Sequence, residues 1–234
     1  MSDELPDISR LASLFADPSR GRMLLSLMDG RMLPASDLAQ AASLSAQGAS
    51  NHLTRLLDGG VVKVENRGRY RYYALADAKI ALAIEALLAV AHERDIQRPT
   101  LRLKGNAQIR FARTCYDHLA GKLAVTIFDA LQSRGYLLRS DTHEFSVTGI
   151  GASWFRSELG IDIASMSKTR RPLARACLDW SERRDHLGGA LGAVLCDAFL
   201  EKKLAQRSPG TRALTLTESG QNFLRLQLGM SGAT

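Results

Sequence analysis

Residues 34–75 constrain the fold most, because a short helix, a turn, a second helix and a basic hairpin can be read there in succession. The second helix is predicted over Ala46–Asp58, with Ser45 as its N-cap and Gly59-Gly60 as its end. Helical spacing places its leucines on one face and short polar side chains on the other. Such an uncharged polar face suits a helix that enters the major groove of DNA, and an ordinary solvated face is the alternative.

The segment after this helix predicts a β-hairpin. Two runs rich in β-branched and aromatic residues, 61–64 and 70–75, flank Asn66-Arg67-Gly68. Arginines near the tip of a hairpin can bind phosphates. The predicted DNA-binding residues of the helix and the hairpin are Ser45, Gln47, Ser50, Asn51, His52, Thr54, Arg55, Arg67, Arg69 and Tyr70. His52 is ambiguous, because its helical phase points partly toward the core.

Several motifs in the first part of the chain carry a family resemblance: Leu14-Phe15-Ala16-Asp17-Pro18-Ser19-Arg20, Asp37-Leu38-Ala39, Ser50-Asn51-His52-Leu53 and Arg67-Gly68-Arg69-Tyr70-Arg71-Tyr72-Tyr73. With these motifs the chain resembles the winged-helix repressors of the ArsR family, from about residue 11 to residue 91. The resemblance implies a homodimeric repressor that a ligand releases from DNA. Arsenic- and cadmium-sensing members carry cysteines on the first helix of the pair, but residues 31–38 contain none. That soft-metal site is therefore absent.

Two further helices predict the dimer interface. The helix that begins at Asp77 is apolar around most of its circumference, so we expect it to be buried against a symmetry mate. The first helix, residues 6–15, carries more apolar surface than a three-helix core needs from a terminal segment. The predicted dimer contacts are this N-terminal helix together with Ile80, Ile84, Leu87 and Leu88.

A length of 234 residues exceeds one winged-helix domain, so a second domain is predicted. We place the DNA-binding and dimerisation domain at 1–98 and an effector or packing domain at 99–234, with the boundary near Pro99. No apolar run of about 20 residues and no signal peptide are evident, which predicts a cytoplasmic protein without a membrane partner. Three cysteines far apart in sequence fit a reducing compartment.

The composition and the motifs also bear on function. A formal charge of +7 and a pI near 9.6 favour a polyanion such as double-stranded DNA as partner, although solubility alone could explain this excess. A nucleophile elbow, a phosphate-binding loop and a dinucleotide fingerprint are all missing, so an enzyme is not expected.

The second half of the chain contains an internal repeat. Arg113-Thr114-Cys115-Tyr116-Asp117-His118 corresponds to Arg175-Ala176-Cys177-Leu178-Asp179, which His186 follows after an insertion. Downstream, Thr148 and Gly151 correspond to Thr217 and Gly220. We therefore predict two repeats, about 106–160 and 168–228, each with the order helix, helix, hairpin, helix and each similar to a reduced winged helix. The predicted fold class is mainly α with small β-hairpins, α+β.

Cysteine and histidine recur in both repeats. If the repeats pack with pseudo-symmetry, they can bring together a mixed sulfur and imidazole site: Cys115, His118, Cys177 and His186. Such a set suits zinc or another thiophilic metal, or a thiol pair open to oxidation. The alternative has both cysteines as small core residues on helices, and the unequal spacing from cysteine to histidine, three positions against nine, favours it. Cys196 is predicted to be a core residue.

These patterns together predict a homodimeric DNA-binding transcriptional repressor, released from a palindromic operator when a ligand binds in or near the C-terminal domain. The alternative is a metal- or thiol-based sensor repressor that uses the Cys/His set. Trp154 and Trp180 are large enough to line a pocket between the repeats, and simple burial is the alternative for each.

Overall fold

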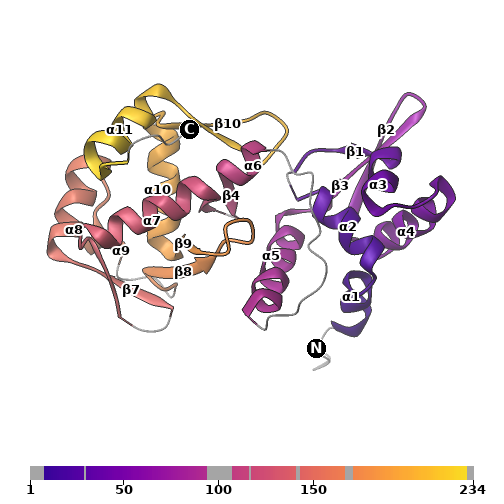
Figure 1. Cartoon of the computed structure of the whole chain (residues 1–234), viewed down its shortest axis with the longest axis horizontal. Helices are drawn as coiled ribbons and strands as arrows, with labels where there is room; N and C mark the ends of the chain where they lie inside the picture. Colours follow the sequence, from indigo (N-terminus) through magenta and orange to yellow (C-terminus); the bar gives the residue numbers. More distant parts are fainter. Residues whose placement is uncertain are drawn as a thin grey trace. The chain divides into compact units, whose positions relative to one another are not determined.

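A computed structural model of the chain describes residues 8–28, 30–93, 107–115, 117–140, 143–166 and 171–230 (Figure 1). The described residues form two compact units, an N-terminal unit up to Ala86 and a C-terminal unit that comprises 87–93 and the residues from 107 onward. The boundary predicted near Pro99 lies outside the described residues. Within these ranges, none of the helices combines the length and the hydropathy that a membrane span requires.

The N-terminal unit is a winged helix-turn-helix, as the sequence predicted. Asp17 caps the second helix through its Oδ1, which accepts hydrogen bonds of 2.9 Å from the amides of Ser19 and Arg20. The three strands form one antiparallel sheet in the order β1-β3-β2. The elements in chain order are α1 (Ile8–Phe15), α2 (Pro18–Ser26), β1 (Leu33–Pro34), α3 (Ala35–Ala42), α4 (Ala46–Asp58), β2 (Val62–Arg67), β3 (Tyr70–Leu75) and α5 (Ala78–Glu93), of which 87–93 belong to the C-terminal unit.

In each half of the C-terminal unit a short helix is followed by the order hairpin, helix, hairpin, helix. Its first half contains α6 (Ala107–Phe111), β4 (Arg113–Cys115), β5 (His118–Ala120), α7 (Lys122–Ser133), β6 (Leu137–Arg139), β7 (Glu144–Val147), α8 (Gly149–Trp154) and the π-helical η1 (Phe155–Leu159). Its second half contains α9 (Ile163–Met166), β8 (Ala174–Leu178), β9 (Asp185–Gly188), α10 (Gly189–Glu201), β10 (Ala205–Arg207), β11 (Leu214–Leu216) and α11 (Glu218–Leu228).

This order corrects one prediction. The segments that carry Cys115 and Cys177 are β-hairpins and not helices, so neither half begins with the pair of helices expected of a reduced winged helix. The physical reason lies in burial: all three residues of β4 and all three of β5 are buried, so these strands lack the alternation of polar and apolar residues that reveals a half-buried strand.

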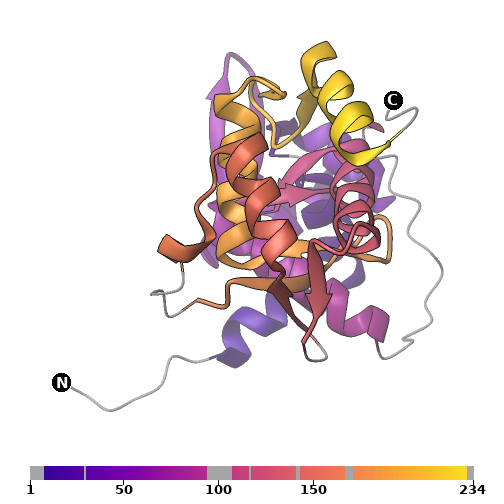
Figure 2. The same ribbon diagram turned by 90° about the vertical axis from the view of Figure 1, so that its left-hand side faces the viewer.

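Hairpins of one half pair with hairpins of the other half. Strand β7 of the first half pairs with β8 of the second half, in a four-stranded sheet of order β6-β7-β8-β9. In the reciprocal position, the amide of Thr114 on β4 donates a 3.0 Å hydrogen bond to the carbonyl of Arg212, just before β11. The helices follow the same reciprocity, because α7 contacts β9 and α10 contacts β5. Both helices lie in the middle of the unit, and α11, yellow in Figure 2, packs on α7.

Equivalent positions in the two halves have equivalent local structure. The hydroxyls of Thr148 and Thr217 each accept a 3.0 Å hydrogen bond from the amide three residues later, and so cap α8 and α11. Gly121 and Gly189, each just after a first hairpin, have φ values of 89° and 85°. A Cβ at either glycine would lie 2.7 Å and 2.8 Å from two backbone carbonyl oxygens, so only glycine fits both the conformation and the space.

Candidate nucleic-acid interface and metal centre

Helix α4 separates a buried apolar face from an exposed polar face. Ala49, Leu53 and Leu56 are buried, whereas the predicted base- or phosphate-contacting side chains are exposed: Gln47, Ser50, Asn51, Thr54 and Arg55. Ser45 caps the helix, because its Oγ accepts a 3.2 Å hydrogen bond from the amide of Gly48. The Gln47 Nε2 donates a 3.3 Å hydrogen bond to the Asn51 Oδ1, so the two side-chain amides are joined on the exposed face.

His52 differs from the other predicted residues of α4. It is half-buried, and its Nδ1 lies 3.7 Å from the Asp17 Oδ1 and 3.5 Å from an Arg20 Nη1. These contacts connect α4 to the start of α2. His52 therefore supports the position of α4 and does not belong to its exposed polar face.

The β2–β3 hairpin ends in a two-residue turn in which Gly68 has a φ of 60°. Tyr70 is 68% exposed, and Arg69 is exposed with no ion pair among the described residues. Arg67 instead donates hydrogen bonds of 2.9 Å and 3.3 Å to the carboxylate of Glu65. This pairing lowers the pKa of the Glu65 carboxyl and raises the pKa of Arg67. Glu65, two positions before Arg67, therefore competes with a phosphate for this arginine and was not among the predicted site residues.

Exposed apolar side chains lie on α1 and α5. Ile8 is 79% exposed and Leu11 41% exposed on α1, and Leu87 is 52% exposed on α5. Ile84, which was predicted as a dimer contact, is buried within the chain itself, because its face of α5 belongs to the core. Ile80 and Leu88 are half-buried.

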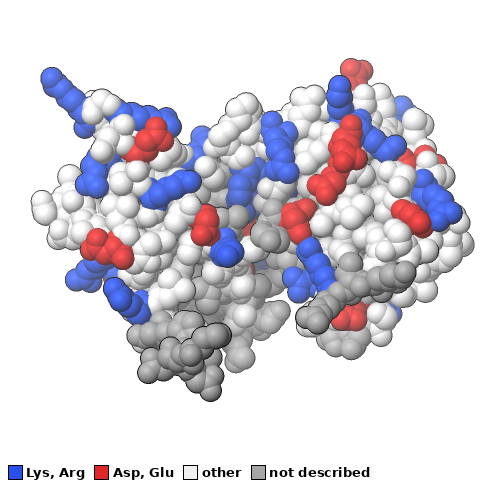
Figure 3. All heavy atoms as spheres, turned by 180° about the vertical axis from the view of Figure 1, so that it is seen from behind, with Lys and Arg blue, Asp and Glu red and all other residues white. Residues whose placement is uncertain are grey.

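Charges of both signs lie on the face of the molecule that Figure 3 displays. Figure 3 shows Lys and Arg interspersed with Asp and Glu on the face that it displays. On this face the lysines and arginines do not form one broad basic patch.

The four predicted metal ligands come together in the C-terminal unit. The ligand atoms of Cys115, His118, Cys177 and His186 all lie within 4.8 Å of one another. The Nε2 atoms of His118 and His186 are 3.1 Å apart, although the residues are separated by 68 positions in the sequence. Cys115, His118 and His186 are buried and Cys177 is half-buried. The exchange of hairpins between the two halves brings these residues to the centre of the unit.

Each histidine of this set has an aspartate oxygen close to its Nδ1 atom. The His118 Nδ1 lies 3.1 Å from the Asp117 Oδ1, and the His186 Nδ1 lies 3.2 Å from the Asp179 Oδ2. Each aspartate follows the cysteine of its half by two positions. This recurrence was the signal that could have identified both aspartates from the sequence.

Each of these carboxylates is held by an arginine. Arg171 donates to both oxygens of Asp117, and Arg113 donates a 3.0 Å hydrogen bond to Asp179, which also accepts a 2.6 Å hydrogen bond from the amide of Gly121. Hydrogen bonding to Arg171 lowers the pKa of Asp117. Burial alone would raise the pKa of Asp179, but the contacts with His186, Arg113 and Gly121 together hold it far below its usual value.

The third cysteine and the two tryptophans take no part in this cluster. Cys196 is buried on α10, and burial raises the pKa of its thiol to about 11, as expected for a core residue. Trp154 stacks on Tyr136 at 5.1 Å between ring centroids, and Trp180 lies over the guanidinium of Arg113 at 4.7 Å. Neither tryptophan lines the pocket described next.

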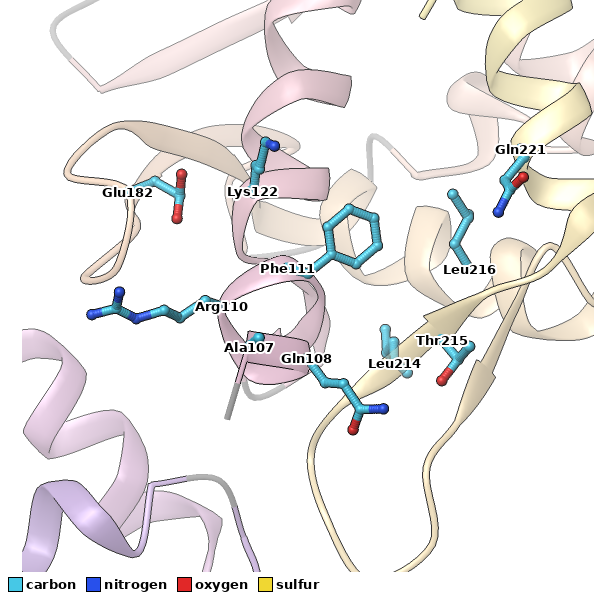
Figure 4. A pocket seen from close by; sticks show the side chains of 10 residues that line it. All are labelled: Ala107, Gln108, Arg110, Phe111, Lys122, Glu182, Leu214, Thr215, Leu216 and Gln221. Carbon is cyan, nitrogen blue, oxygen red and sulfur yellow. The ribbon is translucent and has the colours of Figure 1, made fainter. Parts of the chain in front are cut away.

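An open pocket of about 580 Å³ lies beside α6. Figure 4 shows Phe111 and Leu216 facing each other, with Arg110 and Glu182 together on the other side of α6. Its lining residues are Ala107, Gln108, Arg110, Phe111, Lys122, Glu182, Leu214, Thr215, Leu216 and Gln221. An apolar floor with charged groups at the rim suits a small organic molecule that carries a polar group.

The capped helix α4, its exposed uncharged face and the adjoining hairpin define the class of winged helix-turn-helix DNA-binding proteins. Comparison with known proteins gives the family. Residues 15–65 match the model of a helix-turn-helix domain. The HTH-type transcriptional regulator YdfF of Bacillus subtilis is 45% identical over 216 residues, which cover 92% of this chain and 94% of YdfF. The chain therefore belongs to the HTH-type transcriptional regulators.

Other relatives match a smaller part of the chain. The HTH-type transcriptional regulator CmtR of Mycobacterium tuberculosis is 38% identical over 92 residues, which cover 39% of this chain and 77% of CmtR. Among solved structures, the AntR antimony-specific transcriptional repressor aligns with a TM-score of 0.36 and 28% identity, covering 42% of this chain and 87% of that chain. As a member of this family the chain is a regulator of transcription and not an enzyme.

Proposed function

We propose that the chain is a cytoplasmic homodimeric repressor that binds a palindromic operator and releases it when a ligand binds in the C-terminal unit. The observation that carries this proposal is the exposed polar face of α4 beside the arginines of the wing. Helix α4 enters the major groove, where Gln47 and Asn51 reach base edges and Arg55 reaches phosphates. Arg69 and Tyr70 contact the flanking backbone or the minor groove.

The exposed apolar residues of α1 and α5 support the homodimer. Leu87 and Val90 on α5 are 52% and 49% exposed, and Ile8 on α1 is 79% exposed. An apolar helix face left uncovered by its own chain is stabilised when a second copy buries it. In a twofold dimer, the two α4 helices read half-sites about one helical turn apart.

Two observations in the C-terminal unit bear on the releasing ligand. The open pocket beside α6 favours a small organic molecule. The Cys/His cluster favours the second candidate, a metal- or thiol-based sensor. Either ligand regulates the operator complex if its affinity differs between two states of the dimer.

We also propose that the C-terminal unit consists of two repeats, about 106–160 and 168–228, as the sequence predicted, and that the domain boundary lies near Pro99. The matched threonine caps at Thr148 and Thr217 and the matched glycines Gly121 and Gly189 support the repeats. Such correspondences between side chain and backbone are not required by the element order alone.

The base-reading role of α4 can be tested with a variant and a control of the same type. Operator DNA is first selected from a random pool, and its binding is followed by fluorescence anisotropy. Asn51→Ala should weaken operator binding by about 1–3 kcal/mol and leave scrambled DNA nearly unaffected. Asn222→Ala, an exposed position on α11, should change neither. Equal losses on operator and scrambled DNA for Asn51→Ala would remove the base-reading claim.

The dimer can be tested separately by sedimentation. Leu87→Glu places a charge on the exposed face of α5 and should shift the protein toward monomer. Leu138→Glu, at a residue that is similarly exposed on β6, should leave the dimer intact. A wild-type protein that is monomeric at the concentrations at which it binds its operator would refute the proposed dimer.

A further inference from the structure

We propose that the C-terminal unit binds one Zn²⁺, or another thiophilic divalent cation, in a site outside the winged helix-turn-helix. The four ligands are Cys115, His118, Cys177 and His186. Two aspartates orient the histidines from behind. The proposal rests on strand register, distances, burial and charge.

The strand register shows that the two cysteine–histidine pairs are equivalent, although three positions separate cysteine from histidine in one repeat and nine in the other. Cys115 pairs directly with His118 across the β4–β5 hairpin, and Cys177 pairs directly with His186 across the β8–β9 hairpin. In both hairpins the cysteine and the histidine are opposite each other, so they occupy equivalent positions. Only the loop between the two strands differs in length. The two halves therefore contribute the same pair of ligands in the same arrangement.

The distances fit tetrahedral coordination. Two imidazole nitrogens that bind one Zn²⁺ at about 2.0–2.1 Å lie roughly 3.3 Å apart in a tetrahedron. The Nε2 atoms of His118 and His186 are 3.1 Å apart. The largest separation within the set is no more than 4.8 Å, so a contraction of about 1 Å would complete a Cys₂His₂ site.

The groups behind the histidines are those that a metal site requires. In metal sites a ligating histidine commonly donates its other ring N–H to a carboxylate, which fixes the tautomer and the ring orientation. Asp117 lies 3.1 Å from the Nδ1 of His118, and Asp179 lies 3.2 Å from the Nδ1 of His186. Both Nε2 atoms are thereby directed to the same point.

Charge and donor type select the ion. Two thiolates and two neutral imidazoles balance a divalent cation, and each aspartate is already paired with an arginine, Asp117 with Arg171 and Asp179 with Arg113. A divalent ion therefore brings no net charge into this buried region, whereas a monovalent ion would leave an unbalanced thiolate. Sulfur and imidazole donors prefer Zn²⁺ or Cd²⁺ to Mg²⁺ or Ca²⁺.

The bound ion would join the two halves of the unit, because each half supplies two of the four ligands. His118 and His186 are 68 positions apart in the sequence, so coordination closes a long loop and stabilises the folded unit. That this ion also releases the operator rests on the function proposed above, whereas binding of the ion does not.

Cobalt provides the probe for binding. The full chain is purified with reductant, freed of metal with a chelator and titrated anaerobically with Co²⁺. We expect one equivalent per chain, the strong visible bands of tetrahedral Co²⁺, a near-ultraviolet thiolate-to-cobalt band, and displacement of all of these by Zn²⁺. Absence of a tetrahedral spectrum for the folded, reduced wild-type protein would overturn the site.

Matched variants assign the ligands. Cys115→Ser and Cys177→Ser should each abolish the thiolate-to-cobalt spectrum at one equivalent, and Cys196→Ser, another buried thiol of the same unit, should leave it unchanged. Far-ultraviolet circular dichroism checks folding, and Cys177 is the safer test because it is only half-buried. Wild-type spectra for the first two variants, or loss of the spectrum in a folded Cys196→Ser, would overturn the assignment.

The histidine ligands have a control as well. His118→Gln should weaken Co²⁺ binding and alter its visible bands, and the exposed His143→Gln should do neither. A reduced chain that takes up no cobalt is also treated with a two-electron oxidant such as hydrogen peroxide. If its mass then falls by two hydrogen atoms, because Cys115 and Cys177 form a disulfide and the peroxide is reduced to water, the two thiols are a redox pair and the metal site is refuted.

The regulatory step has its own readout. Zn²⁺ should weaken operator binding by the wild type and not by Cys115→Ser. Operator binding by a protein that takes up no cobalt would refute the site alone, and cobalt uptake by a protein that ignores DNA would refute the proposed function alone. Identical operator affinity with and without Zn²⁺ would refute the regulatory link.

Discussion

The two aspartates behind the histidines should contribute very differently to stability. Asp117 and Asp179 occupy equivalent positions, and each is paired with an arginine, so Asp117→Asn and Asp179→Asn make the same chemical change. The side chains of Arg113 and Asp179 are both 0% exposed. Those of Arg171 and Asp117 are 35% and 31% exposed.

Burial decides the size of each effect. Removing one partner of a fully buried ion pair leaves an uncompensated charge and costs about 3–5 kcal/mol. Breaking an ion pair that water reaches costs about 0–1 kcal/mol. Asp179 also accepts hydrogen bonds from the amides of Gly121, Ser181 and Glu182, and part of these survives in asparagine. We therefore expect Asp179→Asn to destabilise the metal-free protein by at least about 2 kcal/mol more than Asp117→Asn.

Denaturant unfolding followed by tryptophan fluorescence measures this difference. Both tryptophans of the chain, Trp154 and Trp180, belong to the C-terminal unit, so their emission reports the unfolding of that unit. The measurement is made with a chelator present, because a bound ion would add its own stabilisation. In a separate cobalt titration, both variants should lose about 10–100-fold in metal affinity, because both carboxylates orient a ligand. Equal free energies of unfolding for the two variants would refute the reasoning from burial.

Two further predictions concern the wing and the hairpin turn. Glu65→Gln should free Arg67 to bind a phosphate, so that DNA binding becomes tighter and the dependence of log K on log salt steepens by about 0.9. Asp162→Asn is the control, because it removes the same charge from another exposed pair with an arginine. Equal steepening in both variants would mean that the effect comes from net charge alone. Gly160→Ala should destabilise the C-terminal unit by roughly 1–2 kcal/mol, because Gly160 has a positive φ. Gly121→Ala should destabilise it by more, because Gly121 also has a positive φ and a Cβ there would in addition meet backbone oxygens. Tryptophan-monitored unfolding compares them, and equal losses would contradict the steric argument.

The N-terminal unit could be predicted from the sequence because its signals are local. The ends of α4 follow from Ser45 and Gly59, and its orientation follows from the spacing of the leucines. The predicted hairpin turn, Asn66-Arg67-Gly68, begins two residues early, because Asn66 pairs with Arg71, Arg67 pairs with Tyr70, and Gly68 is the first of the two turn residues. These features depend on residues within one or two turns of the chain.

The C-terminal unit was harder because its structure depends on distant pairing. Strands β4 and β5 have three residues each and are buried on both faces, so no periodicity distinguishes them from a helix. The repeat predicted that Cys115 and Cys177 lie near each other, as they do, but the unequal number of residues between cysteine and histidine favoured the alternative of core residues. Only the strand register shows that the two cysteine–histidine pairs are equivalent. Likewise, the half-buried position of His52 follows from its neighbours on α2, which sequence spacing does not reveal.

The strand contacts between the halves, β7 with β8 and β4 with the residues just before β11, determine how the C-terminal unit can be divided. A chain that ended after the first half would keep β7 but lose its pairing with β8, and it would leave Thr114 without its partner at Arg212. Exposed strand edges of this kind readily pair with the strand edges of a second copy of the chain. A fragment with only the first half should therefore be found as a swapped oligomer or an aggregate, and a protease cut between the halves should not make them separate.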